Sequence, residues 1–304
     1  MENLILIKLT SSQRDYTIGR QLGEGNFGRV YFSGHHSLPP VAIKIFNEDN
    51  EARKELEIAT DICNINPKGL VKLLDHGFIE SQITAQYFEV AVGSMFLVYE
   101  YINKSLKDLW DGAKMPTKDI IQIGIQLIES AESIHSAGYV HADLKLDNVM
   151  VDKENKVYLI DYGCAQKYKL PDGSHRLNGS GPNLFTNVHF GSKNALHKQT
   201  ISRRDDLIQI VYNLICLKNS FLPLRDYLPP DNDDLDEFKK FKMESSAREF
   251  CKRNNTRQFT EILNECYGML YDETPNYTKL KFMLKKIILN MNKLPGGKFL
   301  ENHP

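Results

Sequence analysis

The stretch that decides the fold is residues 141–163, which read His-Ala-Asp-Leu-Lys-Leu-Asp-Asn-Val-Met-Val-Asp-Lys-Glu-Asn-Lys-Val-Tyr-Leu-Ile-Asp-Tyr-Gly. Two short runs rich in β-branched residues flank a polar Asp-Lys-Glu-Asn turn, and this pattern predicts a β-hairpin. Asp143 and Asn148 stand before the first run, and Asp161 follows the second. Carboxylate and amide oxygens are the hard ligands that Mg²⁺ prefers. In this arrangement Asp143 would also be free to orient or deprotonate a hydroxyl. For any one of these residues alone, a solvated acid on a surface hairpin is the simpler interpretation.

The composition is that of a folded globular chain. Its 304 residues, 41% hydrophobic and 25% charged, suffice for one or two lobes with a buried core and argue against disorder. The formal net charge of −1 excludes a global field that would draw the chain to nucleic acid or to a membrane. Five cysteines without a Cys-x-x-Cys pair favour reduced thiols in an intracellular protein over disulfides or a zinc site.

Neither the start of the chain nor its apolar segments predict membrane targeting. Residues 1–10 are apolar but carry no basic region and no small-residue cleavage site, so we do not expect a signal peptide. The longest strongly apolar stretch, 207–217, contains Gln209 and Asn213 and is too short to cross a bilayer. We therefore expect a soluble protein.

A glycine-rich segment lies within residues 16–33, where apolar alternation on both sides of a turn predicts strand–turn–strand. Gly23, Gly25 and Gly28 fit the pattern G-x-G-x-x-G, a weak signal that a tight hairpin also explains. A dinucleotide-binding fold needs a helix at this point, and residues 30–32 continue as a strand instead. The segment therefore favours a β-hairpin over a dinucleotide-binding unit.

The next two segments pair an isolated lysine with a helix. Residues 41–44 form an apolar strand that ends in Lys44, which taken alone is most simply a solvent-facing side chain. Residues 50–63 are expected to be helical. Three glutamates there are candidate partners for the lysine, namely Glu51, Glu55 and Glu57. Counting from Glu55, apolar residues follow at three, four and seven positions, whereas counting from Glu57 places an aspartate in that stripe. We therefore select Glu55.

Periodicity predicts the remaining elements in outline. A buried strand that runs into a connector is expected at 95–102, and an amphipathic helix at 119–135. Further helices are expected at 207–217, 244–252, 256–270 and 277–292. Four glycines predict an irregular loop at 164–200. Acidic residues 229–237 predict a solvated linker, and residues 294–304 a frayed tail.

Taken together, these segments resemble a known superfamily. The glycine-rich turn, lysine strand, helix glutamate, H-x-D-x-K-x-x-N run and Asp-Tyr-Gly stand in the order found in protein kinases. Segments resembling the casein kinase 1 family are 105–109, 134–136, 163–168, 202–207 and 274–280. Like that family, the chain lacks Ala-Pro-Glu after the activation segment. The vaccinia-related kinases, which also use Asp-Tyr-Gly, are a close alternative, and the resemblance spans about residues 15–292.

The resemblance implies an α+β fold with two lobes, as in protein kinases. We expect a small β-rich N-terminal lobe at 1–101, a larger and mainly helical C-terminal lobe at 102–293, and a tail at 294–304. It also implies that Asp206 begins a buried helix and hydrogen-bonds the backbone of the catalytic loop.

The resemblance also assigns catalytic roles to residues of this chain. Asp143 would orient the substrate hydroxyl or accept its proton, and Lys145 would neutralise charge on the transferred phosphoryl group. Lys44, paired with Glu55, would fix the α- and β-phosphates of ATP. The protein would supply position and countercharge, since phosphoryl transfer needs little covalent chemistry.

Metal and nucleotide ligands follow from the same resemblance. Asn148 and Asp161 would bind Mg²⁺. Tyr99 would guard the back of the nucleotide pocket, and Met150 would lie under the adenine from the other lobe. The backbone of residues 100–102 would form the hinge that pairs with adenine. The full nucleotide-binding set is Leu22, Gly23, Gly25, Gly28, Val30, Ala42, Lys44, Tyr99, Glu100, Ile102 and Met150.

The function implied is that of an ATP- and Mg²⁺-dependent serine/threonine protein kinase. We expect it to be a monomer that acts on protein substrates in the cytoplasm, the nucleus or both, without nucleic-acid or membrane partners. One alternative is a pseudokinase scaffold, a class that usually loses the lysine, the catalytic aspartate or the metal aspartate; Lys44, Asp143 and Asp161 are all present. A small-molecule phosphotransferase is disfavoured by residues 202–206 and the casein-kinase-like C-terminal segment.

Several residues depart from the family pattern. Ala142 replaces the arginine before the catalytic aspartate, which predicts activity without phosphorylation of the activation segment. His189 stands where the family's anion-binding cluster has an arginine, which predicts a weaker preference for phosphorylated or acidic substrates. Leu146 replaces a proline, Tyr162 a phenylalanine, and Asn187 a threonine in the substrate loop.

Overall fold

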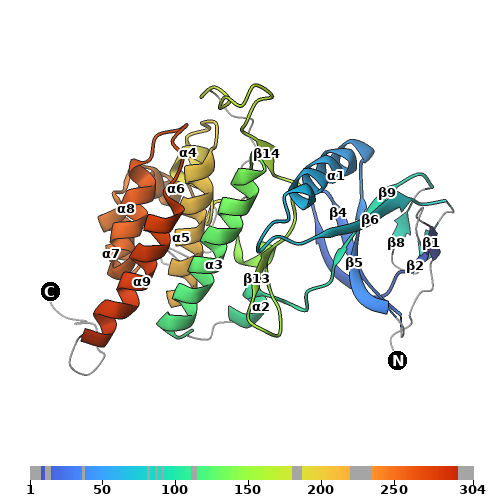
Figure 1. Cartoon of the computed structure of the whole chain (residues 1–304), viewed down its shortest axis with the longest axis horizontal. Helices are drawn as coiled ribbons and strands as arrows, with labels where there is room; N and C mark the ends of the chain where they lie inside the picture. The colour runs from blue at the N-terminus through green and yellow to red at the C-terminus, as the bar shows by residue number, and fades with distance from the viewer. Residues whose placement is uncertain are drawn as a thin grey trace. The chain divides into compact units, whose positions relative to one another are not determined.

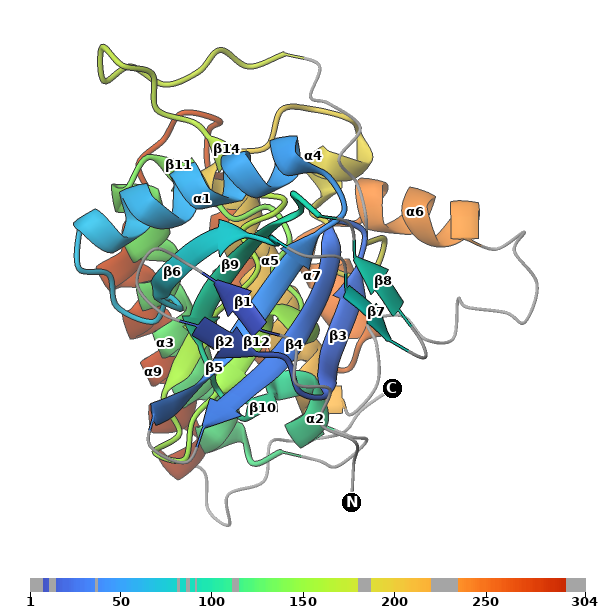
Figure 2. The same cartoon turned by 90° about the vertical axis from the view of Figure 1, so that its right-hand side faces the viewer.

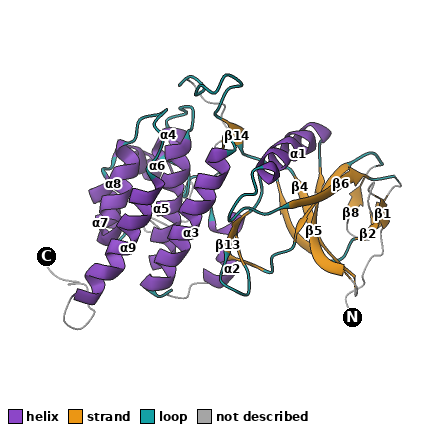
Figure 3. Cartoon of the chain, in the orientation of Figure 1, coloured by secondary structure: helices purple, strands orange, loops and turns teal. Residues whose placement is uncertain are grey.

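A computed structural model of the chain describes residues 8–10, 15–35, 38–80, 83–85, 88–90, 92–110, 115–179, 187–219 and 235–293. The chain forms two compact units (Figure 1). Unit 1 comprises Met1–Asn103 together with Asp161–Gly163, and unit 2 comprises Lys104–Ile160 together with Cys164–Pro304. Strands dominate unit 1 and helices dominate unit 2 (Figure 3). This mixture confirms the predicted α+β class.

Unit 1 is built on a five-stranded antiparallel sheet in the order β3-β4-β5-β9-β6. Its strands are β3 (Gln21–Gly25), β4 (Gly28–His35), β5 (Leu38–Phe46), β6 (Leu73–Phe78) and β9 (Met95–Glu100). Two smaller pairs are β1 (Lys8–Thr10) with β2 (Asp15–Thr17), and β7 (Ile83–Ala85) with β8 (Phe88–Val90). Figure 2 shows β3, β4 and β5 side by side, as their registers require.

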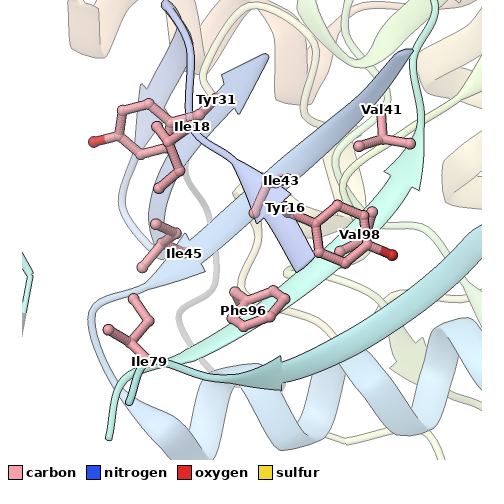
Figure 4. Close-up of a cluster of buried hydrophobic side chains, with 9 residues drawn as sticks. All are labelled: Tyr16, Ile18, Tyr31, Val41, Ile43, Ile45, Ile79, Phe96 and Val98. Carbon is pink, nitrogen blue, oxygen red and sulfur yellow. The ribbon is translucent and has the colours of Figure 1, made fainter. Parts of the chain in front are cut away.

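One face of this sheet is covered by an apolar cluster (Figure 4). Alternate residues of a strand point to the same face, so Val41, Ile43 and Ile45 of β5 join Phe96 and Val98 of β9. The cluster is completed by Tyr16, Ile18, Tyr31 and Ile79. The intervening residues of β5, which include Lys44, are thereby directed to the opposite face.

Helix α1 (Asp49–Asn64) contacts β5, β6 and β9. Its buried positions follow the predicted helical period, with Ala52, Ile58, Ala59 and Ile62 forming the apolar stripe. Glu55 lies in this stripe and is buried with it. The helix therefore carries a carboxylate into the interior of unit 1.

Unit 2 is organised around α5 (Arg203–Asn219), whose residues are buried on almost every side. Helix α3 (Thr117–Ser136) contacts both α5 and α9 (Tyr277–Lys293), and α8 (Thr260–Gly268) contacts α5. The other α-helices in the described part of unit 2 are α2 (Leu106–Trp110), α4 (Lys193–Leu196), α6 (Leu235–Glu244) and α7 (Ala247–Arg253). A helix that is buried all round can position side chains over several turns of its length.

The predicted hairpin is present in unit 2. Strands β12 (Val149–Val151) and β13 (Val157–Leu159) pair in an antiparallel register, and β10 (Lys104–Ser105) adds a third strand beside β12. A second small pair joins β11 (Tyr139–Val140) to β14 (Gln166–Lys167). A 3-10 turn, Leu146–Asn148, leads directly into β12.

Two local predictions were wrong. The segment 164–200, expected to be an irregular loop, contains β14 and α4. Residues 235–237, expected to be part of a solvated acidic linker, begin α6, and the helix expected at 244–252 is α7. The acidic residues Asp236 and Glu237 occupy the first turn of α6, where they interact favourably with the helix dipole. Their charge concealed the helical pattern that begins at Leu235.

Some sequence-based expectations lie outside the described residues. They are the acidic segment at 229–234 and the tail at 294–304. All five cysteines lie within the described ranges, and none forms a disulfide. No helix in the described part of the chain is both long and apolar enough to cross a membrane. The same residues contain no cluster of three or more His, Cys, Asp or Glu side chains that could hold a metal ion.

Candidate active site

A buried lysine is the centre of a charged cluster in unit 1. The side chain of Lys44, 7% exposed, donates hydrogen bonds to Oε2 of Glu55 at 2.5 Å and to Oδ1 of Asp161 at 2.7 Å. Burial alone would lower the pKa of the Lys44 ammonium, but the charges of Glu55 and Asp161 outweigh burial and hold the pKa above its usual value. Lys44 is therefore a fixed positive charge at neutral pH.

Glu55 is the helix glutamate that contacts Lys44, because α1 turns this residue toward the sheet. Its second oxygen, Oε1, accepts a hydrogen bond of 2.8 Å from the hydroxyl of Tyr99. Burial and the charge of Glu55 raise the pKa of the Tyr99 phenol well above its usual value, so Tyr99 donates as a neutral group. Both carboxylate oxygens of Glu55 are thus engaged, as a buried charge requires.

Asp161 belongs to unit 1 although it follows a strand of unit 2 in the chain. Its side chain is 35% exposed, so its carboxylate pairs with Lys44 while remaining open to solvent. Its backbone has a left-handed φ of +65°, an uncommon conformation for an aspartate. The neighbouring Tyr162 is buried, and its hydroxyl donates to the carbonyl of Val71 at 2.9 Å. The hydroxyl that distinguishes Tyr162 from phenylalanine therefore has a partner.

Glycine has a different structural role at Gly28 than at the other two glycine positions of the β3–β4 hairpin. A Cβ on Gly28, whose φ is +153°, would lie 2.1 Å from the carbonyl oxygen of Ile45, so strand packing alone demands glycine there. Gly23 and Gly25 are exposed, and a Cβ on either would meet nothing within 4 Å. These two positions leave the backbone open to an approaching ligand.

The tip of this hairpin touches the Asp-Tyr-Gly segment within unit 1. A Cβ on Gly163 would lie 2.5 Å from the ring of Phe27, so Gly163 accommodates that ring. The Phe27 ring centroid is 5.7 Å from Nζ of Lys44. The hairpin tip thus lies beside the charged cluster.

The other expected nucleotide ligands of unit 1 lie on these strands. Leu22 in β3, Val30 in β4 and Ala42 in β5 are all half-buried. Val30 is paired with Lys44 on the neighbouring strand, and Ala42 is paired with Tyr99. In the expected hinge, the N–H of Glu100 donates to the carbonyl of Lys72 at 3.2 Å. The backbone of Ile102 takes part in none of the turn and loop hydrogen bonds formed among the described residues.

A second set of predicted site residues lies in unit 2. Oδ2 of Asp143 accepts hydrogen bonds from Nζ of Lys145 at 2.6 Å and from Nδ2 of Asn148 at 3.0 Å. Nδ2 of Asn148 also donates to the carbonyl of Asp143 at 2.9 Å. Among the described residues, Oδ1 of Asp143 and Oδ1 of Asn148 have no hydrogen-bond partner. Met150 is half-buried in β12 of the same unit, so it is grouped with these residues and not with the nucleotide ligands of unit 1.

The backbone before Asp143 is held by the first turn of α5. Asp206 accepts hydrogen bonds of 2.8 Å from the N–H groups of His141 and Ala142, which confirms the expected role of Asp206. The ring of His135 lies 2.8 Å from the same carboxylate. Burial alone would raise the pKa of Asp206, but the hydrogen bonds and charge of His135 hold it below its usual value. Asp206 is therefore a stable anion.

Two further polar residues of α5 support this loop. Oε1 of Gln209 accepts from the N–H of Leu144 at 2.9 Å, and Nε2 of Gln209 donates to the carbonyl of Ala142 at 3.1 Å. Asn213 donates to the carbonyl of Leu144 at 3.0 Å. These contacts restrain Ala142 at a φ of +72°, a conformation that costs about 1–2 kcal/mol in a non-glycine residue.

The sequence interpretation missed these supporting residues, although a signal was present. Gln209 and Asn213 are the polar residues that interrupt the apolar stretch 207–217, and with Asp206 they are spaced at three and seven positions. That spacing places them on one face of a helix. The hydrogen bond from Tyr99 to Glu55 was also missed, because nothing in the local sequence relates β9 to α1.

Comparison with known proteins identifies the family of the chain. Residues 16–206 match the family model described as the protein kinase domain, and the chain belongs to the protein kinase family. It is a serine/threonine kinase by family and resembles casein kinase 1. A protein named "Probable casein kinase I homolog" from Encephalitozoon cuniculi is 29% identical over 296 residues, which cover 93% of this chain and 88% of that protein. "Casein kinase I homolog 3" of Schizosaccharomyces pombe is 24% identical over 302 residues, covering 93% of this chain and 64% of that protein.

Proposed function

We propose that this chain is an active kinase that transfers the γ-phosphoryl group of ATP to serine and threonine hydroxyls of protein substrates, in the manner of casein kinase 1. The observation that carries the proposal is the ion pair of Lys44 with Glu55 and Asp161. A buried lysine held between two carboxylates is oriented and charged before any ligand arrives, which suits it to bind phosphate oxygens.

The residues of unit 1 fit the phosphates of ATP. Nζ of Lys44 would contact the α- and β-phosphate oxygens, and Glu55 would keep the ammonium in place. The backbone at Gly23 and Gly25 would approach the phosphates, because no side chain stands between them and the ligand. The backbone of Ile102, which takes part in no turn or loop hydrogen bond among the described residues, supports adenine binding at the hinge. Val30 and Ala42, half-buried on neighbouring strands, suit contact with the adenine ring.

Each unit offers one oxygen ligand of the kind that suits Mg²⁺. Asp161 offers a carboxylate that is 35% exposed, and Asn148 offers Oδ1, since its Nδ2 is occupied by Asp143. Mg²⁺ prefers such hard oxygen ligands. The bound ion would neutralise charge on the phosphates.

Asp143 fits the role of the group that receives the acceptor hydroxyl. Lys145 and Asn148 hold its Oδ2, and the second oxygen is left to accept a hydrogen bond from the serine or threonine hydroxyl. As the hydroxyl oxygen bonds to phosphorus, its proton would pass toward Asp143. Lys145, whose Nζ lies 2.6 Å from Asp143, would contribute positive charge beside the acceptor hydroxyl.

The biological setting remains part of the proposal. The near-zero net charge supports a protein without a nucleic-acid partner, and cysteines that form no disulfide support an intracellular setting. We propose that the protein acts as a monomer on other proteins. We propose lobes at 1–101 and 102–293, as expected from the sequence.

A phosphotransfer assay with radiolabelled ATP, Mg²⁺ and casein tests the proposal. The wild-type protein should label casein, and Asp161→Ala should abolish labelling while the protein remains folded by circular dichroism. Asp49→Ala, which removes an exposed carboxylate of α1, is the matched control and should stay active. A wild-type protein that binds ATP but transfers no phosphate would instead be a pseudokinase scaffold.

A further inference from the structure

A lysine of α6 is fully buried, and no acidic side chain among the described residues pairs with it. Lys242 is 0% exposed, and burial lowers its pKa well below the usual value. No carboxylate within the described ranges forms an ion pair with it. Its Nζ lies 4.3 Å from the ring centroid of Tyr212 and 5.8 Å from that of Phe238. A lysine is almost never fully buried unless it is paired, so the burial of Lys242 needs a structural reason.

The hydrogen bonds of Lys242 go to a turn 53 and 54 positions earlier in the chain. Nζ donates to the carbonyl of Val188 at 2.9 Å and to that of His189 at 2.6 Å. The lysine amine carries three N–H donors when protonated and two when neutral, so both carbonyls keep their partner whether or not Lys242 is charged. Lys242 therefore links α6 to this turn by two hydrogen bonds.

The turn, residues 187–191, is also closed by its own contacts. Oδ1 of Asn187 accepts from the N–H groups of His189 at 2.9 Å and Phe190 at 3.2 Å. The N–H of Gly191 donates to the carbonyl of Asn187 at 2.9 Å. Asn187 thus organises the interior of the turn, while Lys242 binds the carbonyls that point toward α6.

The end of the turn is held by the helix that holds the catalytic loop. Ser192 donates to Asp205 at 2.5 Å, and Asn194 donates to the same oxygen at 2.9 Å. Asp205 directly precedes Asp206, which binds the backbone before Asp143. The turn and the catalytic loop are therefore anchored to neighbouring residues of α5.

These contacts place the turn on the acceptor side of the proposed reaction. The turn, its anchors and Asp143 all belong to unit 2, whereas the phosphate-binding Lys44 belongs to unit 1. Substitution of a residue that fixes the turn should therefore change the affinity for the protein substrate and leave the affinity for ATP unchanged.

We propose that Lys242 is a positioning residue for the acceptor polypeptide: it holds the turn 187–191 in the conformation against which the serine- or threonine-bearing segment docks beside the catalytic loop. This inference rests on the proposed kinase function. It adds a specificity role for a residue that takes no part in the phosphoryl transfer itself.

Lys242→Met tests the inference, because methionine keeps an unbranched apolar side chain and removes both donors. Lys240→Met, at an exposed position of the same helix, is the matched control. We expect Lys242→Met to raise the KM for a casein-derived serine peptide roughly tenfold, because the net contribution of about one hydrogen bond corresponds to a tenfold change in affinity. The KM for ATP should not change in either variant.

Two readouts do not depend on turnover. Hydrogen exchange of the ATP-free protein should be faster at the amides of residues 189–191 in Lys242→Met, and unchanged in Lys240→Met. The Kd for the same peptide, measured by fluorescence anisotropy, should rise in parallel with KM. If the wild type binds peptide but transfers no phosphate, the proposed function fails, while a selective loss of peptide binding in Lys242→Met still supports the docking role.

Other outcomes would overturn the inference. Unchanged peptide KM, or equal losses in every kinetic parameter together with exchange that rises across the whole of unit 2, would show that Lys242 only stabilises the fold. Lys242→Arg retains N–H donors on a longer side chain that displaces the turn. If Lys242→Met does not fold, the test moves to Lys242→Arg, which should raise the KM and Kd for the peptide and not the KM for ATP. Unchanged peptide KM and Kd in Lys242→Arg would refute the positioning role of Lys242.

Discussion

The hydroxyl of Tyr99 donates a 2.8 Å hydrogen bond to Oε1 of Glu55, the carboxylate whose other oxygen binds Lys44. The residue expected to guard the back of the nucleotide pocket therefore also orients the ion pair proposed to hold the phosphates. Because Tyr99 and Glu55 are both buried, the hydrogen bond is shielded from competition by water.

Tyr99→Phe should weaken ATP binding. The substitution leaves Oε1 of Glu55 without its donor, and the free energy of unfolding should fall by about 1–3 kcal/mol, the cost of a buried group that loses its partner. The KM for ATP should rise several-fold with little change in the peptide KM. Denaturant unfolding and ATP titrations measure the two effects. Tyr271→Phe, which removes an exposed hydrogen bond to the carbonyl of Leu177 in unit 2, serves as the control; equal effects in both variants would contradict the prediction.

Asp143→Asn should lower kcat and leave the affinity for ATP unchanged. Asparagine preserves the shape of the side chain and an oxygen that can accept hydrogen bonds from Lys145 and Asn148, but it loses the ion pair with Lys145 and is a much weaker base for the acceptor hydroxyl. General-base catalysis typically contributes about 10²–10⁴-fold, so a loss in that range is expected. Steady-state kinetics with varied ATP and peptide separate the two parameters. Retention of most of the wild-type kcat would remove Asp143 from the proposed role.

His189 should make the protein less stable at acidic pH. Burial and the nearby charge of Lys242 lower the pKa of the His189 imidazole in the folded state. In the unfolded chain the His189 imidazole has its ordinary pKa near 6.5, so as the pH falls the unfolded state binds the proton before the folded state does. The free energy of unfolding should decrease below about pH 6.5, by at most about 1.4 kcal/mol per pH unit for this group. Urea unfolding of the wild type and His189→Gln between pH 5 and 7.5 measures the difference, and parallel curves would disprove the contribution.

The same neutral imidazole predicts a weak preference for primed substrates. At pH 7 His189 cannot supply the bidentate cation that arginine offers to phosphate. Relative to a site with two strong cation contacts, the affinity should be at least about tenfold lower, since each such contact contributes about 1.5–3 kcal/mol. The comparison is kcat/KM for two peptides that differ only by a phosphoserine three residues before the target serine. A strong preference for the phosphorylated peptide would show that other cations bind the phosphate.

Activity should not require phosphorylation of the activation segment. Ala142 has no side chain that could bind a phosphorylated loop residue, and its backbone is already held by Asp206 and Gln209. Phosphatase treatment of purified protein should leave the rate of casein phosphorylation nearly unchanged. A large drop in rate would show that another basic residue has taken over this contact.

Much of the fold could be predicted from the sequence, because local patterns specify local structure. The alternating apolar residues of β5, the three-, four- and seven-residue spacing after Glu55, and the hairpin of β12 and β13 all have periods that only one kind of element satisfies. The order of the short motifs around Lys44, Asp143 and Asp161 indicated the family. Where charge concealed the pattern, as at the start of α6, the prediction was wrong.

Contacts between residues distant in the chain were decided by tertiary structure alone. The hydrogen bond of Tyr99 with Glu55 spans 44 positions, and the bonds of Lys242 with the turn at 187–191 span 53 and 54. No local pattern encodes such contacts, because they depend on which faces of the helices and strands meet when the core is packed. The sequence by itself determined which chemical groups the protein carries, in what order, and that Glu55 is the glutamate on the inner face of its helix. The packing of α1 against the sheet decided that Tyr99 would hydrogen-bond this glutamate, and the packing of α6 against the turn decided which buried amine holds the backbone of residues 188 and 189.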